Sequence, residues 1–265
     1  MRWEAGEVSF RGVTRALVCA VLAAAPPALA FDERELAAQG DRHFAQLSGF
    51  DALEAYEVSK GSASASFVVM RRWSGSSAEV LIDVHEPASL ERLAILIEQN
   101  DNRSDDLFAY FPAWRRVLRL NPRLLQAPIF ELISLGDMRP IAPGELEYSR
   151  LADEEVAGEL CTVLEGRPTH DGLGFEWVEL ALSRDSGFAL RSRFFRSGRE
   201  IRRVLIAPKD LRRYGERLLP ARRRILFDPD GEPLRVELRN LRIDPALPAR
   251  LFSHHNLMTQ RFPSF

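Results

Sequence analysis

Cysteine is scarce in this sequence, which has only Cys19 and Cys161 among its 265 residues. Cys19 falls in an N-terminal stretch with the features of a cleaved leader, so we expect Cys161 to have no disulfide partner. The folded part of the chain must therefore depend on a hydrophobic core. Residues 31–265 are numerous enough to form one large domain around such a core.

The sequence also lacks an uninterrupted hydrophobic run long enough to span a membrane. Its most apolar segment, Ala16–Ala25, is followed by two prolines, whereas a membrane-spanning helix needs about 20 apolar residues. Arg11 and Arg15 precede the segment, and residues 28–30 (ALA) form an A-x-A cleavage site. These features predict that residues 1–30 are a secretory signal peptide.

Cleavage near Ala30 would start the mature chain at Phe31, and we expect this chain to reside in the periplasm. Cys19 raises the alternative of a lipoprotein. Val18 stands where a lipid-modification signal prefers a small residue, which favours an ordinary cleaved signal peptide.

Motifs that mark catalytic or metal sites are missing. We find no Gly-rich phosphate loop, no dinucleotide-binding fingerprint, no G-x-S-x-G elbow and no H-E-x-x-H. None of the five histidines has metal-binding spacing, and His254-His255 is predicted to lie in a solvated turn. Cys161 lies within an apolar strand pattern that favours a buried, inert thiol. We therefore expect a protein without catalytic activity, cofactor or metal. An uncharacterised enzyme remains the last of three hypotheses.

Charge is nearly balanced overall, at −2, but is unevenly distributed. Residues 31–110 hold fifteen acidic and seven basic side chains, and residues 184–224 hold four acidic and fourteen basic ones. Two interpretations follow: solvated faces of opposite charge, or a basic surface for anionic headgroups or an acidic partner. The export signal argues against nucleic acid as the ligand of the basic region.

Alternation of apolar and polar residues dominates the chain from Ser64 onward and predicts about eleven or twelve short strands. The expected strands span residues 66–73, 78–84, 93–97, 107–111, 114–120, 128–133, 160–164, 175–182, 188–195, 200–206, 222–227 and 234–243. Gly- and Asp-containing turns between several of them indicate antiparallel neighbours. Helical pattern is confined to residues 33–47, with shorter turns at 88–93, 143–151 and 208–218.

The last predicted strand changes phase along its length. Its apolar positions run Leu234, Val236 and Leu238, and then Leu241 and Ile243. One extra residue near the shift would produce this pattern, so we expect a β-bulge near Asn240 that bends the strand. A long sheet with few helices must curl, which predicts a mainly β fold with a curved antiparallel sheet.

Four segments together resemble the LolA-like family of outer-membrane lipoprotein-sorting proteins. Residues 105–120 (DDLFAYFPAWRRVLRL) are similar to its D-x-(W/F)-x-Y-x-P-x-x-x-R-V-x-R hairpin. The others are residues 158–165 (GELCTVLE), 187–195 (GFALRSRFF) and 247–253 (LPARLFS). In this order and spacing, the four segments cover most of residues 65–258.

The resemblance implies one unclosed half-barrel domain over residues 31–265, with a few helices plugging its mouth. It further implies a periplasmic carrier for a lipid or the acyl chains of a lipoprotein, with an inner-membrane transporter as partner and transient membrane contact. One segment departs from the family: residues 135–140 (LGDMRP) replace its G-S-D-x-x-Y-E-D continuation near the cavity mouth. The ligand is therefore expected to differ.

Apolar side chains of the predicted strands are the candidates for lining such a cavity. We expect the lining to include some of Phe67, Val69, Trp73, Leu81, Phe108, Tyr110, Trp114, Trp177, Phe188 and Phe194. The sequence leaves open which sheet face each occupies, and each is equally suited to the core. The second hypothesis is a non-catalytic accessory or regulatory module that binds a membrane transporter or another envelope protein through residues 184–224.

Overall fold

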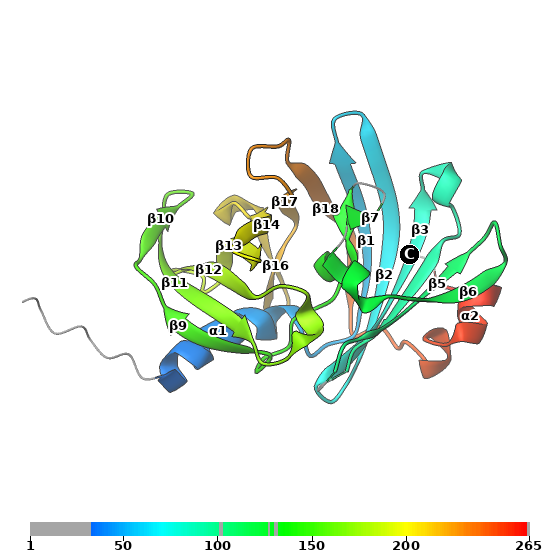
Figure 1. Cartoon of the computed structure of the whole chain (residues 1–265), viewed down its shortest axis with the longest axis horizontal. Helices are drawn as coiled ribbons and strands as arrows, with labels where there is room; N and C mark the ends of the chain where they lie inside the picture. Colours follow the sequence, from blue (N-terminus) through cyan, green and yellow to red (C-terminus); the bar gives the residue numbers. More distant parts are fainter. Residues whose placement is uncertain (1–32, 101–102, 127, 130–131, 264–265) are drawn as a thin grey trace, which may run out of the picture. The chain divides into compact units, whose positions relative to one another are not determined.

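One large antiparallel sheet dominates the computed structural model, which describes residues 33–100, 103–126, 128–129 and 132–263 (Figure 1). The predicted signal peptide, its cleavage site and Cys19 lie outside these residues. In chain order the strands of the sheet are β1 (Ala52–Lys60), β2 (Ala63–Ser74), β3 (Ser77–Glu86), β4 (Ala94–Glu98), β5 (Asp106–Phe111), β6 (Arg116–Leu120), β9 (Leu146–Arg150), β10 (Glu154–Val156), β11 (Glu159–Pro168), β12 (Trp177–Ser183), β13 (Ala189–Arg196), β14 (Arg199–Leu205), β17 (Arg222–Leu226) and β18 (Leu234–Ile243).

The sheet is curved and does not close into a barrel, which confirms the predicted fold class. Its strands are hydrogen-bonded in the order β10-β11-β12-β13-β14-β17-β18-β1-β2-β3-β4-β5-β6, and β9 also pairs with β11. Most neighbours in the sheet are neighbours in sequence, as the turn residues predicted. Three pairs depart from this order: β9 with β11, β14 with β17, and β18 with β1 at the centre of the sheet.

The predicted bulge lies in this central pair. Ala55 of β1 is opposite Asn240 of β18, whereas the next residue, Tyr56, is opposite Leu238. Arg239 is therefore the extra residue of β18, next to the position expected from the sequence.

Several local predictions are wrong because strand pairing overrides them. Residues 143–151, expected to hold a helical turn, instead contain β9, which pairs with β11. Residues 208–218 contain one 3-10 turn, Pro208–Asp210, followed by a hairpin of β15 (Leu211–Tyr214) and β16 (Arg217–Pro220). The expected strand 128–133 is replaced by the two-residue strands β7 (Pro128–Ile129) and β8 (Ile133–Ser134), and the sheet has fourteen strands.

Helix α1 (Glu33–Leu47) spans the predicted residues. Glu33 and Glu35 lie in its first turn, where carboxylates interact favourably with the helix dipole. Leu36 and Phe44 are buried against β9, β11, β12 and β13. The helix α2 (His254–Thr259) begins at the His254-His255 pair, so the prediction of a solvated turn there is wrong, and the His254 ring contacts Phe108.

Both faces of the sheet are covered, by different parts of the chain. We call inner face the one that carries Tyr56, Phe67 and Val69, which packs against Leu132, Leu135 and other residues of the 122–138 segment. The outer face carries Leu53, Met70, Leu81 and Leu96, which pack against Leu247, Leu251, Phe252 and Leu257 near the C-terminus. In the described part of the chain, no helix combines the length and apolar character needed to cross a bilayer.

Candidate functional site

A cavity of about 150 Å³ lies against the inner face, under α1 and residues 136–141. We call α1 and residues 136–141 together the cover. Strand alternation aims inner-face side chains of β1, β2, β13, β14, β17 and β18 at this cavity. Its apolar lining consists mainly of Phe44, Leu47, Phe50, Tyr56, Phe188, Phe194, Val204, Ile206, Leu219 and Leu238. This composition suits an apolar ligand.

Charged side chains also line the cavity, although the surrounding positions are apolar. Arg71 of β2 is 8% exposed and forms an ion pair with Glu54 of the neighbouring strand β1. Its Nη1 donates a hydrogen bond to the carbonyl oxygen of Leu47, at the end of α1, over 2.8 Å. The pair therefore connects the inner face to the cover.

A second buried ion pair connects the cover to β14. Nη1 of Arg202 lies 2.9 Å from Oδ1 of Asp137, and both side chains are at most 4% exposed. The Arg202 guanidinium also lies 3.9 Å from the centre of the Phe194 ring. Burial lowers the pKa of Arg202, because the apolar surroundings disfavour the charged form.

Arg223 of β17 is the third arginine of this group and differs from the other two. It is half-buried on the inner face, and its guanidinium lies 5.5 Å from the centre of the Tyr56 ring. Among the described residues, no carboxylate lies within ion-pair distance of it. The positive charge of Arg223 therefore faces the cavity without a protein counter-ion.

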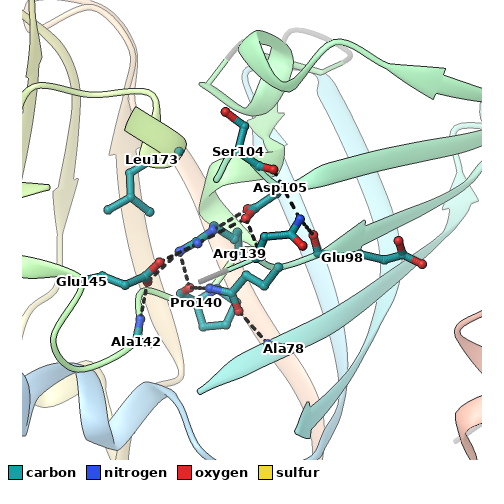
Figure 2. Close-up of polar contacts among 12 residues, drawn as sticks. Ala78, Glu98, Ser104, Asp105, Arg139, Pro140, Ala142, Glu145 and Leu173 are labelled. Carbon is teal, nitrogen blue, oxygen red and sulfur yellow. Dashed lines mark hydrogen bonds and ion pairs between the residues drawn. The ribbon is translucent and has the colours of Figure 1, made fainter. Parts of the chain in front are cut away.

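The end of the cover is fixed by a polar cluster around Arg139 (Figure 2). Arg139 Nε lies 2.7 Å from Asp105 Oδ2, and its Nη2 lies 2.7 Å from Glu145 Oε1. Gln99 donates a hydrogen bond to the carbonyl oxygen of Pro140, over 2.9 Å. Burial opposes the charge of Arg139, but the Glu145 and Asp105 carboxylates outweigh it and raise the pKa of Arg139.

His43 of α1 is the one histidine at the cavity. Its side chain is buried, its ring lies against Phe188, and its Nδ1 accepts a hydrogen bond from the backbone N–H of Ala189 over 3.3 Å. Burial lowers the pKa of His43 to about 3. The imidazole is therefore neutral at physiological pH and acts as a packing and hydrogen-bonding group.

The ten candidate lining residues are divided among different places. Phe188 and Phe194 line the cavity, and Phe67, Val69 and Trp73 lie nearby in the inner-face core. Leu81, Phe108 and Tyr110 lie on the outer face under the C-terminal segment. Trp177 stacks on Phe195 at 4.8 Å, and Trp114 is 62% exposed in the β5–β6 turn. Ligand contact stays a prediction for all ten.

Sequence reasoning missed the charged part of the site. Glu54, Arg71, Arg202 and Arg223 each occupy a position in phase with apolar neighbours of the same strand. A charge in the apolar phase of a half-buried strand is the signal that could have identified them. Their grouping depends on the sheet order β14-β17-β18-β1-β2, which sequence periodicity does not supply.

Part of the basic region 184–224 is neutralised by carboxylates of the same part of the chain. Its ion pairs include Arg184–Asp153, Arg191–Glu154, Arg193–Glu179, Arg203–Glu200 and Arg222–Glu237. Most of these arginines are partly exposed. These pairs reduce the excess of positive charge in the region but do not cancel it.

Groups suited to metal binding or nucleophilic chemistry are not assembled in the described ranges. No cluster of three or more His, Cys, Asp or Glu residues there could hold a metal ion. Cys161 is buried, as predicted, and burial raises the pKa of its thiol.

Comparisons with known proteins place the chain in a family. A family model described as "Uncharacterized protein" matches residues 76–259. No curated protein sequence matches the chain.

Three solved structures share the fold. A domain assigned to outer membrane lipoprotein-sorting proteins from Vibrio parahaemolyticus has a TM-score of 0.75 and 19% identity, covering 86% of this chain and 100% of that one. A DUF1329 family protein from Desulfovibrio piger has a TM-score of 0.73 and 20% identity, covering 85% and 97%. A LolA superfamily protein from Nitrosomonas europaea has a TM-score of 0.64 and 19% identity, covering 83% and 97%. The chain thus belongs to the DUF1329-like family of uncharacterised proteins and has the fold of LolA-like lipoprotein-sorting proteins.

Proposed function

We propose that this chain is a periplasmic carrier that holds a lipid, or the acyl chains of a lipoprotein, for transfer between the inner and outer membranes. The observation that carries the proposal is the partly open cavity between the inner face and the cover, with a mainly apolar lining. Enclosed apolar cavities with a few polar groups are the usual binding sites for hydrophobic ligands.

The size of the cavity requires the cover to move when a ligand enters. Its volume of about 150 Å³ is below the range of about 300–1,000 Å³ typical of small-molecule sites. An acyl chain would therefore displace α1, residues 136–141 or both.

The attachments of α1 suit such a movement. In addition to its buried residues Leu36, Gly40, His43 and Phe44, it is held by polar contacts near its C-terminal end. Arg217 Nη1 donates to the carbonyl oxygen of Ala45 over 2.9 Å, and the backbone N–H of Leu218 donates to Gln46 Oε1 over 3.1 Å. Water can replace hydrogen bonds of this kind at moderate cost in free energy.

We further propose that the β5–β6 hairpin and the 3-10 turn that follows it (Pro122–Gln126) make transient contact with a membrane. Trp114, Leu118 and Leu124 are exposed large apolar side chains. Exposed arginines at positions 115, 116 and 123 accompany them. Tryptophan and arginine together favour the interface of an anionic bilayer, where the ring enters the headgroup region and the cations remain near phosphates.

The carrier is proposed to be non-catalytic, with no cofactor and no nucleic-acid ligand, and to receive its cargo from an inner-membrane transporter. Support comes from the fold shared with a LolA superfamily protein.

A second candidate function is an accessory module that binds another envelope protein without a lipid cargo. The small cavity volume favours it. The edge strand β6 offers it a surface, because a partner strand could pair with its free edge.

Native mass spectrometry of the full-length gene product, exported and purified from the periplasm, tests the carrier. The spectrum is recorded before and after organic extraction of bound molecules. Co-purifying lipid or acylated protein, or uptake of a fluorescent fatty-acid probe, is the expected result. A protein that is empty and also excludes the probe would overturn the carrier and favour the accessory module.

A further inference from the structure

Three arginines face the cavity from adjacent parts of the inner face, and each has unused capacity to bind an anion. Arg71, Arg202 and Arg223 belong to β2, β14 and β17, whose inner-face side chains line the same cavity. For a cavity that holds only hydrocarbon, buried cations are unfavourable because they lose their hydration. Arg71 and Arg202 have carboxylate partners in the protein, whereas Arg223 has none among the described residues.

The hydrogen bonds of the two most buried arginines are incomplete. Arg71 uses its Nη atoms for Leu47 and Glu54, and Arg202 uses Nη1 for Ser134 and Asp137. The Nε atoms of both are buried and, among the described residues, have no hydrogen-bond partner. Buried donors without partners are rare in native proteins and costly. Each Nε is thus a donor that a ligand acceptor could satisfy, but protein atoms cover it, so a ligand reaches it only when the cover moves.

Charge balance adds an independent argument. Glu54 and Asp137 neutralise Arg71 and Arg202 one for one, and Arg139 is paired with two carboxylates, Asp105 and Glu145. Among the described residues Arg223 forms no ion pair, and its guanidinium lies 5.5 Å from the centre of the Tyr56 ring. It also lies close enough to Arg202 for their charges to repel. An anion between them would relieve this repulsion.

We propose that the cargo of this carrier is an amphiphile with an anionic head, a carboxylate or a phosphate, which is bound by Arg223 and the free Nε donors of Arg71 and Arg202. The inference rests on the proposed carrier function. It deepens that function by placing the head of the ligand under the cover and its chain along Phe188 and Phe194. A lipid with a neutral head would leave Arg223 without a counter-ion.

The test compares two fluorescent probes that differ only in the charge of the head, cis-parinaric acid and its methyl ester. Both are titrated into the full-length gene product exported to the periplasm and stripped of bound lipid. The inference expects the wild-type protein to bind the acid about tenfold more tightly than the ester. Arg223→Gln should remove this preference, and Arg223→Lys should retain most of it.

Arg224→Gln is the matched control, because it removes the same charge from the next residue of β17, which faces the opposite side. It should leave both affinities within about twofold of wild type. Equal weakening of acid and ester binding by Arg223→Gln would show a structural role and overturn the inference. Circular dichroism of each variant checks that the fold is retained.

Further measurements distinguish an anionic amphiphile from free phosphate, and failure of the anionic-head inference from failure of the carrier proposal. Lysophosphatidic acid should displace parinaric acid, whereas sodium phosphate should not; displacement by phosphate alone would overturn the assignment of an amphiphile. Equal affinity of the wild-type protein for acid and ester would overturn the anionic head and leave the carrier standing. Failure to bind either probe would overturn the carrier itself, and the inference with it.

Discussion

Arg202 Nη1 of β14 lies 2.9 Å from Oδ1 of Asp137 in the cover, and both side chains are almost completely buried. This pair joins residues far apart in the sequence and fixes residues 136–141 over the cavity. Because water cannot replace a lost partner at such depth, the contact contributes strongly to holding the cover in place.

Replacing the carboxylate should therefore destabilise the protein markedly. Asp137→Asn leaves the Arg202 charge buried and unpaired, and we expect the free energy of unfolding to fall by about 3–5 kcal/mol. Urea denaturation followed by fluorescence measures the change. Asp185→Asn, in an exposed turn, is the control and should change stability by less than about 0.5 kcal/mol. A cost below about 1 kcal/mol for Asp137→Asn would contradict the role given to the pair.

Much of the fold could be predicted from the sequence because it follows local patterns. Leu36, Phe44 and Leu47 recur at helical spacing, and α1 has the predicted bounds. Alternation of apolar and polar residues predicted most of the strands whose partners in the sheet are also their neighbours in sequence. The phase shift in β18 located the bulge.

The errors arise where distant pairing decides the local structure. Residues 143–151 and 208–218 begin with prolines suited to a helix, but their backbones pair as strands. Strand β1 was missed because Glu54 occupies one of its inner-face positions and interrupts the apolar alternation. That carboxylate is tolerated only because Arg71 lies beside it in the folded sheet.

The candidate site was less predictable than the fold, for the same reason. Of the predicted lining residues, Phe188 and Phe194 border the cavity, whereas Leu81 and Tyr110 belong to a strand phase that faces the C-terminal segment. The cover determines which side chains of a strand face the cavity, and the residues of the cover are far from most of the strands in sequence.

Acidification should weaken the fold through His43. The pKa of His43 is lowered to about 3 by burial, below the value of about 6.5 expected in the unfolded chain. The neutral ring therefore contributes stability above pH 6.5, and this contribution is lost as the pH falls from 6.5 toward 3, because the unfolded state takes up the proton first. Between pH 7 and pH 5 the loss is about 2 kcal/mol.

Urea denaturation of wild type and His43→Asn at pH 7 and pH 5 isolates this contribution. The asparagine amide oxygen can still accept from the Ala189 N–H, so the variant should fold and lose about 2 kcal/mol less than wild type on acidification. His255→Asn, at an exposed position of α2, should retain the wild-type pH dependence. Identical pH dependence of wild type and His43→Asn would exclude His43 as the cause.

The contact between α1 and β9 should control how readily the cover opens. A Cβ atom at Gly40 would lie 2.3 Å from Cζ of Tyr148, whose hydroxyl donates to Asp41 over 3.3 Å. Gly40→Ala must displace the ring or the helix, and we expect a destabilisation of about 1–3 kcal/mol. Stopped-flow fluorescence should also show faster uptake of a fatty-acid probe.

Removing the obstructing ring provides the internal check. Combining Gly40→Ala with Tyr148→Ser should cost less stability than the sum of the two single changes, because the clash is then absent. Ala38→Ser, on the exposed side of the same helix, should leave probe uptake unchanged. Unaltered uptake in Gly40→Ala, despite a measured loss of stability, would indicate that the ligand enters by displacing residues 136–141 and not α1.

Membrane contact should depend on the exposed apolar tip between β5 and β6. Trp114 and Leu118 are 62% and 37% exposed, and burying both in a bilayer interface is favourable because it removes apolar surface from water. Changing both to Ser should weaken co-sedimentation with phosphatidylglycerol vesicles about tenfold or more. Met258→Ser is the matched control, since Met258 is 47% exposed on α2. If the control weakens binding equally, vesicle association reflects general apolar exposure. If only the change of Trp114 and Leu118 weakens it, the β5–β6 hairpin directs the carrier to its membrane. Phosphatidylcholine vesicles should then bind more weakly, because they lack the net negative charge that attracts the arginines of the hairpin.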